Sequence, residues 1–165
     1  YWESAEDDDA LYLKNQRQWV GRYLRENMGG NLDIYRNAAF LTLDADDCYG
    51  TVHPRDAQIS ESVLIVCSEI QRQLAEGNLK LQEDESIVMT MQALSGIIIN
   101  CRNKWKNAWS KEYCEMDEDR LVETVLKYMT DWMMVRCEAE WIIVLPAVGR
   151  LAGQYPSDYK GDGEE

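Results

Sequence analysis

The sequence predicts an all-α fold, a single-domain bundle of about six to eight helices around a central apolar helix. Residues 86–101 contain no ionisable side chain except the Cys101 thiol, although 28% of the chain is charged. A helix that is apolar on nearly every side must be surrounded by protein or lipid, and this stretch is shorter than the roughly 20 residues that a bilayer requires. Apolar residues at helical spacing recur on both sides of it, without strand-like alternation of useful length. We therefore expect amphipathic helices to enclose residues 86–101.

The other expected helices follow from the same periodicity and from the residues that begin and end helices. Their ranges are residues 10–28, 32–43, 55–76 and a helix that begins at residue 117. Gly29 and Gly30 should end the first helix, because glycine adopts the left-handed C-cap conformation without a steric cost. We expect residues 1–153 to form the bundle domain and residues 154–165, with little to bury, to form a flexible acidic tail.

The charge of the chain restricts its partners. A net charge of -13 at pH 7 argues against nucleic acid, whose phosphates need a basic surface, and equally against an anionic membrane surface. A basic protein partner, or simple solubility, is compatible with this charge. We recognise no signal peptide, transit peptide or membrane-spanning segment in residues 1–165.

The cysteines bear on the cellular compartment. Five of them, an odd number without close pairs, are spread over the chain. Cys67, Cys101 and Cys137 lie within apolar helical patterns, where a free thiol behaves as a small hydrophobic residue. This pattern favours a reduced, cytoplasmic protein, and a secreted protein with one or two disulfides is the alternative.

We find no catalytic or metal-binding signature. The single histidine, His53, lies in a polar loop beside Pro54, and no nucleotide-binding, hydrolase or zinc motif is present. Residues 44–50 superficially resemble the start of a calcium loop, but the twelfth position is Arg55 instead of the required glutamate. We therefore expect no enzyme activity, no cofactor and no metal.

Three stretches are similar to the Bcl-two family of apoptosis regulators, and most of all to its divergent viral members. Residues 11–26 (LYLKNQRQWVGRYLRE) are similar to the first helix of the family. Residues 69–104 resemble the segment of the family in which a helix is followed by an acidic residue and a glycine, here Glu76 and Gly77, and then by an apolar hairpin helix. Trp132 with Trp141 resembles the late tryptophan pair, at a spacing two residues longer, whereas the Asn-Trp-Gly-Arg and Gly-Gly-Trp signatures are absent.

The resemblance implies a Bcl-like bundle without enzymatic chemistry, a protein–protein interaction module that captures an amphipathic helix or a signalling protein. Such a module would inhibit apoptosis or innate immune signalling, as in a host–virus interaction. The residues that would line its groove, and that would serve equally well in a plain core, are Tyr35, Phe40, Val63, Val66, Ile70, Leu74, Met89 and Met91. Two other hypotheses stay open: a secreted helical cytokine, and an acidic inhibitor or immunity protein that binds a basic partner.

Overall fold

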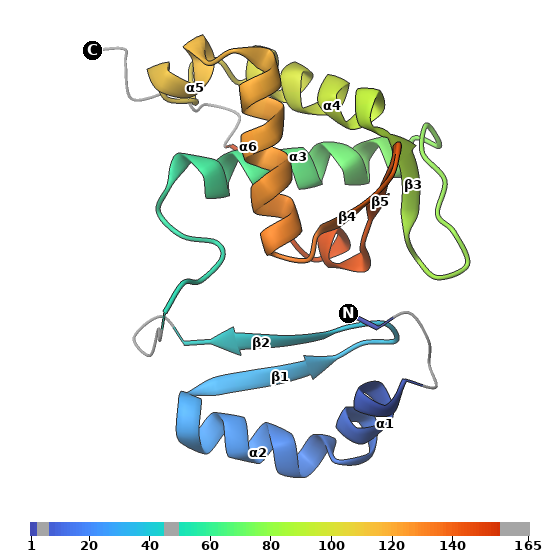
Figure 1. The fold of residues 1–165 in the computed structure, drawn as a ribbon. Helices are drawn as coiled ribbons and strands as arrows, with labels where there is room; N and C mark the ends of the chain where they lie inside the picture. The colour runs from blue at the N-terminus through green and yellow to red at the C-terminus, as the bar shows by residue number, and fades with distance from the viewer. Residues whose placement is uncertain (3–6, 45–49, 156–165) are drawn as a thin grey trace. The chain divides into compact units, whose positions relative to one another are not determined.

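The computed structural model describes residues 1–2, 7–44 and 50–155 of the chain. The chain divides into two compact units, unit 1 (Tyr1–Val52) and unit 2 (His53–Glu165), and each contains helices together with an antiparallel sheet (Figure 1). The predicted all-α, Bcl-like bundle is therefore wrong, and the fold is mixed α/β. None of the described helices is long and apolar enough to span a membrane.

The described part of unit 1 contains two consecutive helices and a hairpin. Helix α1 (Asp8–Asn15) begins at Asp7, whose side chain accepts hydrogen bonds from the backbone of Asp9 and Ala10. Helix α2 (Arg17–Met28) follows after a break at Gln16, so the single helix expected over residues 10–28 is two. The predicted stop is confirmed, since Gly29 adopts a left-handed conformation with φ 62° at the C-cap.

The segment of residues 32–43, which the periodicity predicted to be a helix, is instead an antiparallel hairpin. Strand β1 (Gly30–Ile34) pairs with strand β2 (Ala39–Leu43), with Gly30 opposite Leu43 and Ile34 opposite Ala39. A Cβ at Gly30 would lie 2.6 Å from a methyl carbon of Leu41, so a side chain there would displace the end of the Leu41 side chain. The apolar residues of this segment pack in a strand pair because pairing across the turn at residues 35–38 outweighs helix propensity.

The described part of unit 2 contains four α-helices and a three-stranded sheet. The elements are α3 (Gln58–Ala75), β3 (Ile87–Thr90), α4 (Met91–Lys104), α5 (Lys111–Glu115), α6 (Glu118–Asp131), β4 (Val135–Glu138), β5 (Trp141–Val144) and the 3₁₀ turn η2 (Pro146–Gly149). The sheet is antiparallel, with β5 between β3 and β4. Helix α3 packs against α4 and α6, and both of those helices also contact the sheet (Figure 1).

The stretch expected to be one central helix is a strand followed by a helix. Residues Ile87–Thr90 form β3 and pair with β5, and the chain turns into α4 at Thr90, whose hydroxyl accepts a hydrogen bond from the Ala93 amide at 3.2 Å. Helix α4 buries only one face, whereas Met91, at its first turn, is 38% exposed. The prediction of a helix enclosed on every side is therefore wrong. Residues 86–101 are apolar because a strand and a half-buried helix follow one another directly in this stretch.

The core of unit 2 lies where the three long helices meet the sheet. Helix α3 contributes Val63, Val66 and Ile70 to this core, and each is at most 1% exposed. Helix α6 contributes Leu121, Val125 and Met129 at helical spacing, all fully buried. Because each fully buried aliphatic side chain stabilises the fold by about 1.5–3 kcal/mol, this cluster dominates the stability of the unit.

Candidate functional site

The outer surface of the three-stranded sheet carries exposed apolar side chains. Residues paired across antiparallel strands point to the same side of a sheet, so Val88, Ile143 and Arg136 form one outward row, and Thr90, Trp141 and Glu138 form the next. We call these six residues the sheet face. Trp141 is 51% exposed and Val88 is 42% exposed, whereas the alternate residues of the same strands are in the core.

A charged pair borders the apolar part of the sheet face. The guanidinium of Arg136 lies 2.8 Å from the Glu138 carboxylate, and both side chains are on the edge strand β4. An exposed tryptophan with aliphatic neighbours and a polar rim is the composition found at the centres of protein–protein interfaces. The sheet face is therefore the strongest candidate binding surface of unit 2.

Helix α6 and the hairpin that follows it present an acidic surface. Glu118, Asp119 and Glu123 lie on the exposed side of α6, and Lys127 is paired with Asp131 at 2.6 Å. Glu138, at the end of β4, and Glu140, in the turn before β5, add exposed carboxylates. This surface repels phosphates and attracts cations.

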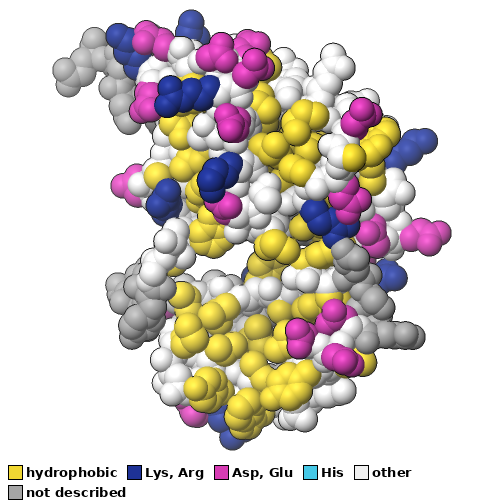
Figure 2. Space-filling view, viewed as in Figure 1, with side chains coloured by type: hydrophobic (Ala, Val, Ile, Leu, Met, Phe, Trp, Pro, Cys, Tyr) yellow, Lys and Arg dark blue, Asp and Glu magenta, His cyan; other side chains and the backbone are white. Residues whose placement is uncertain are grey.

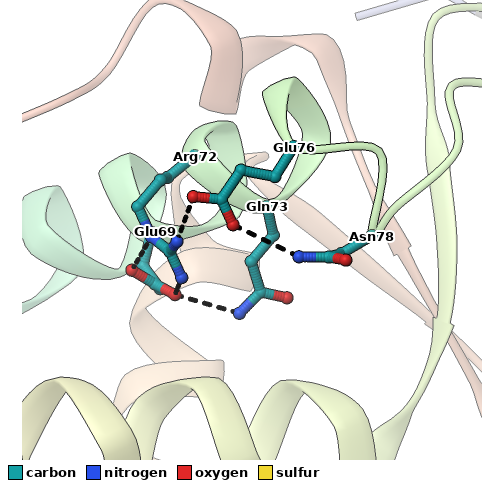
Figure 3. Close-up of polar contacts among 5 residues, drawn as sticks. All are labelled: Glu69, Arg72, Gln73, Glu76 and Asn78. Carbon is teal, nitrogen blue, oxygen red and sulfur yellow. Dashed lines mark hydrogen bonds and ion pairs between the residues drawn. The ribbon is translucent and has the colours of Figure 1, made fainter.

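A cavity of about 490 Å³ lies between α3, α4 and the segment after η2. Its charged wall is a network on α3, in which Arg72 donates two hydrogen bonds to Glu69, at 2.6 and 2.9 Å, and a further one to Glu76 (Figure 3). Gln73 also donates to Glu69, at 3.0 Å. The hydrogen bonds from Arg72 lower the pKa of the Glu69 carboxyl to about 2, so this carboxylate stays charged at neutral pH.

The arginine of this cavity is already paired, and its thiol is buried. Arg72 is already shared by two carboxylates, and the cavity also contains Lys104, which lies over the Trp105 ring at 5.3 Å. The Cys101 thiol at its base is 3% exposed, and burial raises its pKa to about 12. A thiol with such a pKa is a poor nucleophile at neutral pH.

The segment after η2 is fastened along helix α3. The Gly153 amide donates to the Leu64 carbonyl at 3.1 Å and to the Ser68 hydroxyl at 2.9 Å, and the Ser68 hydroxyl is 2.6 Å from the Gly153 carbonyl oxygen. A Cβ at Gly153 would lie 2.7 Å from that of Leu64, so the close approach requires glycine. Tyr155 then packs on Trp105, with ring centroids 5.2 Å apart.

The histidine is part of the packing of unit 2. His53 Nδ1 lies 3.0 Å from the Tyr128 hydroxyl and 3.2 Å from the Ser60 hydroxyl, and its ring packs against Trp132. Burial lowers the pKa of His53, so the neutral ring is favoured. Ser60 is fully buried, so this Ser–His contact is closed to a substrate. In the part of the chain that the structure describes, no cluster of His, Cys, Asp and Glu could hold a metal ion, and residues 45–49 of the rejected calcium loop lie outside it.

The residues expected to line a groove are distributed over both units. Tyr35 and Phe40 are in the unit 1 hairpin, with their rings edge to face at 5.8 Å. Val63, Val66, Ile70 and Met89 are in the core of unit 2, with Leu74 packed against it. Of these six expected groove residues in unit 2, Met91 is the one that is exposed, and it lies at the start of α4.

The sequence interpretation missed the sheet face. The signal was the pair of short runs VRCE and WIIV separated by two residues, which is the spacing of a β-hairpin. The signal is weak because the two turn residues, Ala139 and Glu140, are not the usual asparagine or glycine, although Ala139 does adopt a positive φ of 49°.

The order of elements in unit 2 is similar to a known topology. A helix, a strand, two long helices and a hairpin that pairs back onto the first strand also follow one another in winged helix-turn-helix domains, where α6 corresponds to the second helix and β4–β5 to the wing. Unit 2 departs from the simplest form of this domain because α5 and its flanking residues lengthen the connection between α4 and α6.

The family follows from the comparison with known families. The family model described as a protein of unknown function, DUF2398, matches residues 1–154. The chain therefore belongs to the DUF2398 family. No curated protein matches it.

Proposed function

We propose that this chain is a non-enzymatic protein–protein interaction module, and that unit 2 binds an amphipathic helix of a partner protein through the sheet face. The observation that carries this proposal is the half-exposed Trp141 beside Val88, on a sheet whose other side is the core. Tryptophan at the centre of a flat apolar surface contributes strongly to binding when a partner excludes water from it.

The spacing of the sheet face supports a helical partner. Its two outward rows are separated by two residues along each strand, or about 6.6 Å. Apolar side chains three or four residues apart on a helix are about 5–6 Å apart, so a helix can place successive residues against the two rows. The Arg136–Glu138 pair at the rim would meet polar residues that flank the apolar stripe of such a helix.

The charge of α6 weighs against nucleic acid as the partner. In helix-turn-helix proteins the second helix enters the major groove and its flanks contact phosphates. Here that helix exposes the carboxylates of Glu118, Asp119 and Glu123 against the single cation of Arg120, and its exposed Lys127 is neutralised by Asp131. Binding to a polyanion requires net positive contacts, which this surface lacks.

The same carboxylates favour a second candidate, an acidic inhibitor that binds a basic protein through α6. The two candidates differ in their salt dependence, because exposed charge pairs are screened by salt and apolar burial is not. An association constant that falls steeply with salt supports the α6 candidate, and a shallow dependence supports the sheet face.

A photocrosslinking experiment tests the sheet face. A photoreactive amino acid is placed at Val88 and, as a control, at the exposed polar Glu83, and the protein crosslinked only at Val88 is identified and purified. Its affinity is then measured for the natural chain, for Trp141→Ala and for Tyr35→Ala, which removes an aromatic side chain of unit 1 that is 49% exposed. We expect Trp141→Ala to weaken binding by about 2 kcal/mol, the scale of an interface hot spot, and Tyr35→Ala to leave it unchanged. Equal effects of the two variants would contradict the proposal.

A further inference from the structure

Unit 1 has an exposed surface of a different composition around the junction of α1 and α2. Trp19 and Tyr23 stack on each other with ring centroids 5.6 Å apart, and they are 58% and 53% exposed. Tyr12 and Leu11 of α1 are exposed as well, and Figure 2 shows hydrophobic side chains gathered over unit 1. A stacked aromatic pair in water is a preformed apolar anchor with little side-chain entropy left to lose.

Basic side chains surround this aromatic pair. A hollow of about 350 Å³ at the start of α2 is lined by Lys14, Arg17, Trp19 and Arg22. The first turn of α2 contains no acidic residue. Lys14 is held by the Arg36 carbonyl at 3.2 Å and lies over the Trp2 ring, so its ammonium has a fixed position. We call Lys14, Arg17, Trp19, Arg22 and Tyr23 the basic corner.

Two arginines of the basic corner have no carboxylate partner among the described residues. Arg17 and Arg22 make no ion pair with a described carboxylate, although the chain has 30 Asp and Glu residues against 17 Lys and Arg. The same is true of Arg120 in unit 2, so a missing carboxylate partner does not by itself mark a site. Arg17 and Arg22 differ because both line a hollow beside the exposed aromatic stack, where an anion from another molecule can reach them.

We infer that the basic corner binds an acidic segment of a protein partner, one that carries carboxylates next to an apolar side chain. The inference rests on the proposed function, because it takes the chain to be a protein-binding module. It assigns to this chain a second binding surface besides the sheet face. The carboxylates would pair with Arg17 and Arg22, and the apolar side chain would pack on the Trp19–Tyr23 stack. Tryptophan, tyrosine and arginine are the residues most enriched at the energetic centres of protein interfaces.

The charges nearby favour a short peptide segment over a nucleic acid. Asp8 and Asp9 lie in the first turn of α1, and Glu26 lies on the exposed side of α2 one turn beyond Arg22. A long polyanion that followed the helices would meet these carboxylates as well as the four cations Lys14, Arg17, Arg22 and Arg25, whereas a short acidic segment ends before it reaches the carboxylates.

Peptide binding to the full chain tests this inference. The probe is a short fluorescein-labelled peptide of alternating Asp and Leu, compared with its Asn and Leu counterpart and with an oligothymidylate of similar length, by fluorescence anisotropy. We compare the double variant Arg17→Glu, Arg22→Glu with the control Lys106→Glu, Arg120→Glu, which makes the same change of net charge at two exposed positions of unit 2. Circular dichroism checks that both fold.

We expect the acidic peptide to bind more tightly than the Asn peptide. We also expect the unit 1 double variant to weaken the affinity for the acidic peptide by roughly ten-fold or more, and the unit 2 control to change this affinity by less than about two-fold. Trp19→Ala should weaken it as well, whereas Trp141→Ala should not. Equal effects of the two double variants, no preference over the Asn peptide, or tighter binding of the oligothymidylate would each overturn the inference. Any of these failures would leave the sheet face untouched, since that surface is tested through Val88 and Trp141.

Discussion

Arg102 joins the end of α4 to the start of α6, and its replacement by methionine should destabilise unit 2 more than any exposed ion pair does. The side chain is almost buried, and the residue is 8% exposed. Its guanidinium donates one hydrogen bond to the Met116 carbonyl at 2.9 Å and a second to the Glu118 carboxylate at 2.8 Å. Arg102 therefore holds the connection through α5 against the two helices that it links.

The magnitude follows from what each partner loses. In Arg102→Met the Met116 carbonyl loses a charged donor, a hydrogen bond of the kind that contributes about 1.5–3 kcal/mol. The Glu118 side chain is 59% exposed and regains water, so its half of the interaction contributes less than about 1 kcal/mol. We expect Arg102→Met to lower the free energy of unfolding by about 2–3 kcal/mol, and Glu118→Gln by less than about 1 kcal/mol.

Urea denaturation followed by circular dichroism measures both variants, with a fall in the midpoint at unchanged slope as the signature of lost stability. Lys111→Met is the control, because its pair with Glu115 is long, at 3.7 Å, and exposed. It should change the free energy of unfolding by less than about 0.5 kcal/mol. If Glu118→Gln costs as much as Arg102→Met, or if Arg102→Met is as mild as the control, the carbonyl contact does not have the role assigned to it.

Three further predictions concern other parts of unit 2. In Gly153→Ala the new methyl meets Leu64 at 2.7 Å, so we expect a loss of about 1–3 kcal/mol and faster hydrogen exchange over residues 151–155; unchanged exchange would show that the segment is not fastened there. Burial lowers the pKa of His53 below its unfolded value of about 6.5. The stability that the neutral ring contributes is therefore complete above about pH 6.5, and it is lost as the pH falls from there through the lower pKa of the folded chain. Urea midpoints between about pH 8 and pH 5 should therefore fall more for the natural chain than for His53→Gln, and an equal fall would contradict this. Iodoacetamide followed by peptide mapping should label the exposed Cys137 before unfolding and the Cys101 thiol, whose pKa is about 12, only after unfolding; early labelling of Cys101 would refute its burial.

Local patterns predicted α3 and the start of α6 well. The spacing of Val63, Val66 and Ile70 indicated the inward face of α3, and these residues are in the core. The end of α2 at Gly29 could also be predicted, because helix capping depends on only a few neighbouring residues. A helix closes its hydrogen bonds within one turn, so a short window of sequence contains the information that it needs.

The strands could not be recognised in this way. Residues 87–90 are as apolar as the helix that follows them, and an apolar run alone does not distinguish a buried strand from a buried helix. They form β3 because β5, about fifty residues later, offers the hydrogen-bonding partner. Residues 32–43 were misread for a related reason, because their pairing depends on a turn at residues 35–38 that no strong glycine or proline signal marks.

The sequence by itself determined the amphipathic long helices, the acidic character of the surface and the basic residues of α2. Only the tertiary structure decided which apolar residues are in the core and which face water. Val88 and Met89 are adjacent in sequence and similar in character, yet one is 42% exposed and the other 4%. The difference is set by the register of β3 on β5, because side chains alternate between the two faces of a sheet and only one face is covered by helices.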